Sequence, residues 1–167
     1  MGASGRDGGL ALGRAPVLCL VGDGSFMMNL QELATIVHHK LPVRIVLLSN
    51  RGYAMVRQTE TQWLDGVNAG TSDRTGLGFP DFAALARSFG FKTFSLSASA
   101  GTERILADAF AHDGPVFIEV EIDERHGVYP QSRFGYPIED SDPLLPREEF
   151  LSNMIVAPMP KSLESIE

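Results

Sequence analysis

The sequence is poor in cysteine, and this limits both its chemistry and its compartment. Cys19 is the only cysteine among 167 residues and lies in the apolar run Val17–Val21. A single cysteine cannot form a disulfide within its own chain, which is typical of proteins from a reducing compartment. A thiol in such a run is expected to be buried and inert rather than to act as a nucleophile.

The sequence also lacks an excess of positive charge and any long apolar segment. Fourteen Lys and Arg stand against 21 Asp and Glu, so the formal charge is −7, the wrong sign for binding phosphate backbones or anionic lipid. No apolar run approaches the ~18 residues of a membrane helix, and the first five residues, 1–5, contain no signal-peptide core. We therefore expect a cytoplasmic protein with neither a nucleic-acid nor a membrane partner.

The remaining composition predicts one main domain followed by an arm. A chain with 44% hydrophobic residues at this length can bury one sizeable core. The charge is uneven, because residues 118–167 hold eleven acidic and four basic residues, whereas residues 1–117 hold ten of each. We predict a main domain over residues 1–125. Residues 126–167 are predicted to form a proline-rich arm with a short helix, Arg147–Ile155, that packs on the domain or on a partner.

Strand-like and helix-like patterns alternate along residues 17–122. Short apolar runs predict buried strands, and apolar residues at helical spacing predict the helices between them. Asn29 and Glu32 are spaced as a capping box that would begin the first helix. The alternation favours an α/β fold, an open parallel sheet with helices on both faces. The polar, glycine-rich residues 60–78 are expected to form a functional or partner-facing loop. The expected strands are Val17–Val21, Val43–Leu48, Lys92–Leu96 and Val116–Ile122, and the expected helices are Asn29–Val37, Asp81–Phe89 and Thr102–Ala111.

Two polar residues follow consecutive predicted strands, Asp23 after the first and Asn50 after the second. In an open parallel sheet the carboxyl ends of the strands meet at one edge, where ligands bind, so these side chains should converge. A carboxylate, an amide oxygen and a backbone carbonyl form a donor set suited to Mg²⁺ that carries a diphosphate. Gly22 and Gly24 would admit such an anion close to the backbone, and a helix opening after Ser25 would direct free N–H groups towards it. Gly-Asp-Gly by itself is a common turn.

Spacing and context extend this pattern to a known family. Gly22-Asp23-Gly24-Ser25, Leu30-Gln31-Glu32-Leu33-Ala34-Thr35, Leu41-Pro42-Val43, and Asn50 twenty-seven residues after Asp23 resemble the thiamine-diphosphate motif of the acetolactate synthase-like enzymes. The resemblance covers about residues 16–130 and continues through Gly52-Tyr53-Ala54-Met55-Val56-Arg57-Gln58, Pro80-Asp81-Phe82, Leu85-Ala86 and Gly114-Pro115-Val116-Phe117-Ile118-Glu119-Val120.

The resemblance implies thiamine diphosphate and Mg²⁺ as cofactors, and it assigns roles by position. The implied metal ligands are Asp23, Asn50 and the carbonyl of Gly52. The implied cofactor contacts are Gly22, Gly24 and Ser25 at the diphosphate, Tyr53 and Ala54 on its other side, and Met28 and Met55 near the aminopyrimidine or the reacting centre. Without the motif, each methionine would be read as core filler.

Parts of the family's full-length enzymes have no counterpart here. The glutamate that activates the cofactor belongs to a pyrimidine-binding domain, so no catalytic residue is assigned to this chain. The diphosphate-binding domain also looks slightly truncated, because in relatives another strand and a helix precede the segment at Gly13-Arg14-Ala15-Pro16. We therefore expect a larger partner chain with the pyrimidine-binding domain, in an assembly of two of each.

The expected activity is decarboxylation of a 2-oxo acid and transfer of the resulting acyl carbanion equivalent to an acceptor. Thr59 stands where acetolactate synthases tend to have a tryptophan in the substrate pocket, which puts acetolactate as the product in question. Two alternatives stay open: a two-subunit 2-oxo acid decarboxylase, in which a proton captures the intermediate, and a non-catalytic remnant that binds a partner.

Overall fold

The structure is a computed structural model that describes residues 15–97 and 101–164. The chain divides into two compact units, Met1–His126 and Gly127–Glu167, which are treated separately below. The helices of the described residues include none that is long and apolar enough to cross a membrane.

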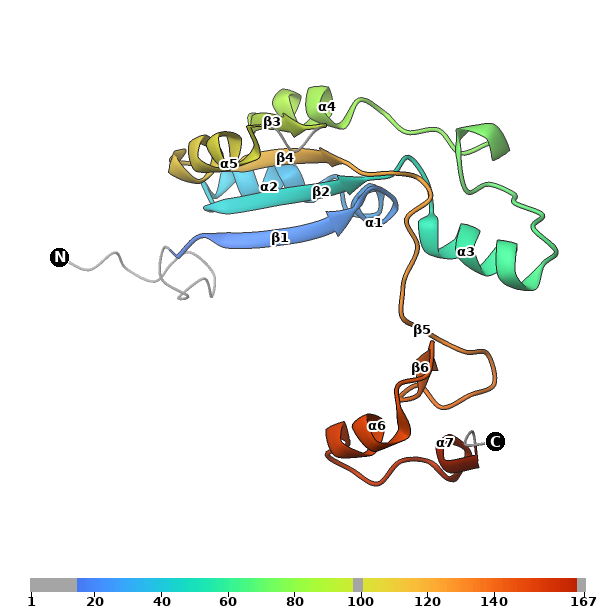
Figure 1. Ribbon diagram of the computed structural model, residues 1–167. Helices are drawn as coiled ribbons and strands as arrows, with labels where there is room; N and C mark the ends of the chain where they lie inside the picture. The colour runs from blue at the N-terminus through green and yellow to red at the C-terminus, as the bar shows by residue number, and fades with distance from the viewer. Residues whose placement is uncertain (1–14, 98–100, 165–167) are drawn as a thin grey trace. The chain divides into compact units, whose positions relative to one another are not determined.

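A four-stranded parallel sheet forms the centre of the first unit (Figure 1). Its strands are β1 (Val17–Gly22), β2 (Val43–Ser49), β3 (Lys92–Leu96) and β4 (Val116–Glu121), arranged in the order β1-β2-β4-β3. Every pairing in this sheet is parallel, as expected when a helix lies between successive strands. The predicted α/β class is therefore confirmed, and the predicted strand bounds agree with the structure to within one residue.

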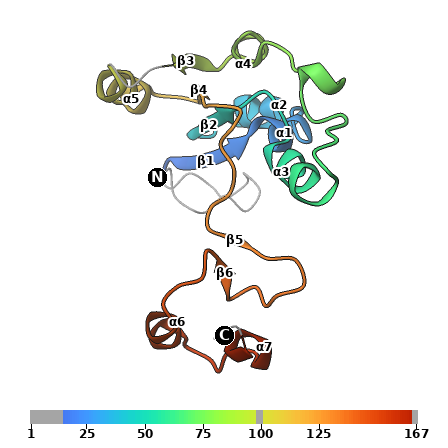
Figure 2. The same cartoon turned by 45° about the vertical axis from the view of Figure 1, so that its right-hand side comes forward.

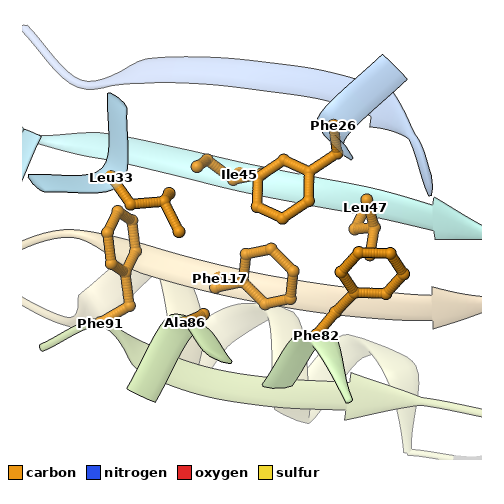
Figure 3. Packing of buried hydrophobic residues seen from close by; sticks show 8 residues of the cluster. All are labelled: Phe26, Leu33, Ile45, Leu47, Phe82, Ala86, Phe91 and Phe117. Atoms are coloured by element: carbon orange, nitrogen blue, oxygen red, sulfur yellow. The ribbon is translucent and has the colours of Figure 1, made fainter. Parts of the chain in front are cut away.

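Helices cover both faces of this sheet. On one face, α1 (Asp23–Met27), α2 (Glu32–His38) and α4 (Phe82–Phe89) pack over a cluster whose centre is Phe117, a residue with no exposed surface (Figure 3). On the other face, α5 (Thr102–Ala111) packs against β3 and β4. Because side chains alternate along a strand, Phe117 belongs to the first cluster and its two neighbours to the second. The first cluster contains Phe26, Leu33, Ile45, Leu47, Phe82, Ala86, Phe91 and Phe117, and the second contains Leu96, Ala109, Val116 and Ile118.

The prediction that the first strand is buried was wrong. Among the described residues β1 pairs only with β2, so it is an edge strand, and Leu18 and Leu20 are 50% and 66% exposed. Cys19 is exposed for the same reason, contrary to the expectation of a buried thiol. An apolar run identifies a strand, but its burial depends on which elements cover it, and α5 packs against β3 and β4 rather than β1.

The start of the first helical region also differs from the prediction. The chain turns directly into α1 at Asp23, whereas a helix opening after Ser25 was expected. Asn29 lies in the turn between α1 and α2, and α2 begins at Glu32 without a side-chain cap. The residue before α2, Gln31, already has helical dihedrals (φ −62°, ψ −25°). A capping side chain needs an extended residue at that position, so the predicted capping box does not form.

The later helices follow the sequence more closely. The carboxylate of Asp81 accepts a hydrogen bond from the N–H of Ala84 at 2.8 Å and begins α4, and Gly90, with φ of 100°, ends it. The predicted loop over residues 60–78 is only partly a loop. Helix α3 (Ala54–Trp63) extends into it, and a single 3₁₀ turn, η1 (Asp73–Thr75), follows.

The second unit consists of a short antiparallel pair and two short helices. These are β5 (Gln131–Ser132), β6 (Ser141–Asp142), α6 (Arg147–Asn153) and α7 (Pro160–Glu164). A buried ion pair holds it together, because Arg147 donates to both carboxylate oxygens of Asp140 at 2.9 and 3.0 Å. The same guanidinium lies 4.7 Å from the ring centre of Phe150. A bidentate ion pair of this kind fixes the geometry of the unit, which has few regular elements.

Candidate cofactor site

The side chains of Asp23 and Asn50 meet at the carboxyl edge of the sheet. Asp23 is the first residue of α1, directly after β1, and Asn50 directly follows β2. The backbone N–H of Gly52 donates to both, to Oδ2 of Asp23 at 3.3 Å and to Oδ1 of Asn50 at 3.2 Å. Figure 2 shows α1 and α3 beginning beside each other at this edge. The structure thus brings all three predicted metal ligands together at this edge of the sheet.

Asp23 carries a carboxylate in a place that favours a cation. The residue is 2% exposed, and its Oδ1 accepts from the N–H of Gly24 at 2.7 Å. None of the ion pairs formed by the described residues involves Asp23. A buried carboxylate that has only backbone N–H partners gains from a metal ion that compensates its charge. Within the described parts of the chain, no three His, Cys, Asp or Glu side chains gather into a metal site. The oxygen donors present, one carboxylate, one amide and one carbonyl, fit Mg²⁺ that takes its other ligands from a diphosphate and water.

The ring of Tyr53 packs against Gly24 beside the candidate ligands. A Cβ added to Gly24 would lie 2.4 Å from Cδ1 of Tyr53, so a larger residue has no room unless the ring moves. The ring of Tyr53 lies edge-on to Phe79, with centroids 6.1 Å apart. A Cβ on Gly22 would have no neighbour within 4 Å, so packing among the described residues does not require glycine there. Tyr53 and Ala54 also stand at the beginning of α3, whose first N–H groups have no partner within the helix.

The remaining predicted contacts lie at the surface. Ser25 is exposed, and Met28 and Met55 are 73% and 68% exposed. Neither methionine belongs to the two hydrophobic clusters, whereas Met27 packs against the first of them. The alternative interpretation of Met28 and Met55 as core filler therefore does not describe this structure.

The segment at Thr71 and Ser72 pairs with the backbone at Gly52 and Tyr53, and the sequence analysis did not predict this contact. The N–H of Tyr53 donates to the carbonyl of Thr71 at 2.9 Å, and Gly52 forms an isolated antiparallel bridge with Ser72. Ser72 and Thr75 form a reciprocal capping box around η1 that gives this segment its shape. Ser at position 72 and Thr at position 75 have the spacing of such a box, but nothing in the spacing says what the segment contacts.

Glu119 lies near the site and also escaped the sequence analysis. It is paired with Leu47 in the register of β2 and β4, so it lies on the face covered by α4. Burial raises the pKa of this carboxyl, and the charge of Asp81 acts in the same direction. A hydrogen bond with Ser49 and the positive charge of Arg51 oppose the shift without cancelling it.

The raised pKa of Glu119 predicts that Glu119→Gln increases the free energy of unfolding in a pH-dependent way. The folded protein binds the Glu119 proton more tightly than the unfolded chain does, so the associated stability is complete at low pH. It is lost as the pH rises from the ordinary range of a glutamate through the raised pKa. Urea unfolding should therefore show the stability of E119Q increasing relative to the wild type across that window. The exposed Glu103→Gln is the control for the loss of one negative charge, and a flat difference between E119Q and the wild type would contradict the assignment.

This geometry defines an α/β domain with a candidate site at the carboxyl edge of its sheet, and comparison with known proteins gives its family. Residues 1–120 match the family described as thiamine pyrophosphate enzyme, C-terminal TPP binding domain, where pyrophosphate is another name for diphosphate. The chain belongs to this family.

Acetolactate synthases are among its similar relatives. The large subunit from Porphyra purpurea is 41% identical over 114 residues, which cover 68% of this chain and 19% of the relative. The large subunit of isozyme 2 from Escherichia coli K12 is 40% identical over 114 residues, 68% of this chain and 20% of that protein. The large subunit from Haemophilus influenzae is 34% identical over 142 residues, 84% of this chain and 24% of that protein. The resemblance to acetolactate synthase-like enzymes is confirmed, and the chain spans about a fifth of the length of these relatives.

Solved structures agree on the fold. A thiamine diphosphate-dependent 4-hydroxybenzoylformate decarboxylase from Rhodococcus jostii RHA1 is 27% identical, with a TM-score of 0.58 over 65% of this chain and 20% of that chain. A benzoylformate decarboxylase from Polynucleobacter necessarius is 24% identical, with a TM-score of 0.61 over 69% of this chain and 21% of that chain, which supports the fold alone.

Proposed function

We propose that this chain is the diphosphate- and Mg²⁺-binding part of a thiamine diphosphate-dependent enzyme of the acetolactate synthase type. The enzyme would decarboxylate a 2-oxo acid and transfer the acyl carbanion equivalent to an acceptor. The observation that carries the proposal is the convergence of Asp23 and Asn50 on the N–H of Gly52, in a chain of this family. Bound thiamine diphosphate supplies the electron sink for decarboxylation, and the protein supplies position and charge.

Residues of two segments, 22–28 and 50–55, would hold the cofactor. Oxygens of Asp23 and Asn50 and the carbonyl of Gly52 would hold Mg²⁺, which neutralises the diphosphate. The backbone at Gly22, Gly24 and Ser25 would lie against one side of the diphosphate, and Tyr53 and Ala54 against the other. Met28 and Met55, both exposed, would border the organic part of the cofactor.

The acid–base chemistry would come from a second chain. We expect a larger partner, in an assembly of two of each in the cytoplasm, whose pyrimidine-binding domain provides the activating glutamate. Exposed apolar side chains on α3 and in the turn after it, Val56, Trp63 and Leu64, support an interface next to the site, with exposed fractions of 49%, 51% and 57%.

Two observations favour simple decarboxylation as the second candidate reaction. The solved structure from Rhodococcus jostii is a decarboxylase, and Thr59 stands in this chain where acetolactate synthases tend to have a tryptophan. In that reaction a proton would take the place of the acceptor carbonyl.

Native mass spectrometry followed by product analysis tests these proposals. We expect the complex isolated from its own cells, kept in Mg²⁺, to contain a larger chain and a mass matching thiamine diphosphate. Incubation of that complex with a 2-oxo acid and an acceptor should give a carboligated product, whereas an aldehyde as the sole product would select the decarboxylase. A complex without thiamine diphosphate would contradict both reactions and favour the non-catalytic remnant.

A further inference from the structure

Two residues that flank Gly52 each carry a buried polar atom without a hydrogen-bond partner. Among the described residues, Nη1 of Arg57 and Oγ1 of Thr71 are in this condition. A Cβ added to Gly52 would lie 2.7 Å from Nη1 of Arg57 and 2.5 Å from the carbonyl oxygen of Thr71. A buried group of this kind calls for an explanation, such as an ion or water that completes its site.

Arg57 connects the Gly52 turn at the start of α3 to a segment 67 residues further along the chain. Its backbone N–H bonds the carbonyl of Tyr53 at 2.8 Å within the first turn of α3. Its Nη2 donates to the carbonyl of Glu124, after the end of β4. The guanidinium therefore lies against Gly52 and is held by the segment that follows β4. A planar guanidinium suits this position better than an ammonium, because it presents several donors in a rigid arrangement.

The turn that Arg57 crosses is held in an unfavourable conformation. Arg51, between the two implied ligands Asn50 and Gly52, has φ of 53°, the left-handed region that residues with a Cβ avoid. Such a conformation persists only when its surroundings hold it in place. The restraints are the hydrogen bonds from the Gly52 N–H, the bridge to Ser72, and the close approach of Arg57.

We propose that Arg57 is a positioning residue for the metal: its guanidinium, held by the Glu124 carbonyl, fixes the Gly52 peptide so that its carbonyl points at Mg²⁺. This proposal rests on the proposed function. It assigns to Arg57 no contact with substrate or with the reacting atoms. Its effect should therefore appear in metal affinity and in the symmetry of the metal site.

The test uses the full chain with thiamine diphosphate and Mn²⁺, a paramagnetic substitute for Mg²⁺. We expect Arg57→Ala to raise the Kd for Mn²⁺ about tenfold, the lower end of what loss of an outer-sphere partner costs. At saturating Mn²⁺, its electron paramagnetic resonance spectrum should differ from that of the wild type. Arg57→Lys, which keeps the charge and one donor, should recover part of the affinity and keeps the test informative if the alanine variant folds poorly.

Arg74→Ala is the matched control. Arg74 pairs with the side chain of the same Glu124 at 3.1 Å rather than with its carbonyl, so its loss should leave the Kd for Mn²⁺ and the spectrum unchanged. Equal Mn²⁺ affinity and an identical spectrum in Arg57→Ala and the wild type would overturn the positioning role alone. If the wild type binds Mn²⁺ no better than Asp23→Asn, the proposed function fails, and the role of Arg57 fails with it.

Discussion

Replacing Asp23 by asparagine should raise the Kd of the chain for Mg²⁺-bound thiamine diphosphate by about 100-fold or more, the largest binding effect that we expect. The substitution keeps the shape of the side chain, but its single oxygen replaces two acceptors, Oδ1 for the N–H of Gly24 and Oδ2 for the N–H of Gly52. It removes the single negative charge of the implied ligand set, and Mg²⁺ depends strongly on carboxylate charge. Isothermal titration calorimetry with Mg²⁺ and thiamine diphosphate measures the change.

The same substitution should act in the opposite direction on the chain without metal. Asp23 is 2% exposed and forms none of the ion pairs of the described residues, so its charge is costly when no cation is bound. In excess chelator, removal of the buried charge should offset the loss of one of the two hydrogen bonds, so D23N should unfold at the same denaturant concentration as the wild type or at a higher one. Addition of Mg²⁺ and thiamine diphosphate, at concentrations above the Kd of the wild type but below that of D23N, should stabilise the wild type and leave D23N unchanged.

Exposed Asp113→Asn is the control, because it makes the same chemical change away from the site. It should follow the wild type in both conditions. A D23N variant that loses stability in chelator but still gains it from Mg²⁺ and thiamine diphosphate would show that Asp23 is a structural carboxylate and no metal ligand.

The sequence predicts the fold well because the local signals and the topology agree. Apolar runs such as Val43–Leu48 are too short for helices and too apolar for surface segments, and helical spacing fills the gaps between them. The parallel arrangement follows from this alternation, and the carboxyl edge follows from the arrangement. The same reasoning places Asp23 and Asn50 together, and their shared bond to the Gly52 N–H shows that they converge.

What the sequence did not reveal depends on contacts between distant segments. The exposure of Cys19 depends on β1 being at the edge of the described sheet, a property of strand order that its own residues do not encode. Thr71 lies next to Gly52 although the two residues are nearly twenty positions apart. Arg57 reaches Gly52 across the first turn of α3, a helix whose last residues were predicted to be loop. Neither Thr71 nor Arg57 belongs to a sequence pattern that distinguishes a residue supporting a turn from an ordinary surface residue.

A glycine series separates the packing of the site from its ligand binding, and Gly52→Ala should have the largest effect on stability. The added Cβ would lie 2.5 Å from the backbone oxygen of Thr71, which cannot move without losing its bond to Tyr53. We expect a loss of about 2–4 kcal/mol in the free energy of unfolding, typical of severe overpacking, together with loss of Mg²⁺ binding.

The other two glycines make this result interpretable. Gly24→Ala places its Cβ 2.4 Å from the ring of Tyr53, a side chain that can rotate, so we expect a smaller loss of about 1–2 kcal/mol. Gly22→Ala meets no atom within 4 Å and has φ of −81°, so the chain alone should tolerate it. If G22A is as stable as the wild type in chelator yet binds thiamine diphosphate more weakly, the ligand itself must occupy the space over Gly22. If G22A leaves binding unchanged while G52A abolishes it, the diphosphate does not approach Gly22, and the metal turn alone carries the affinity.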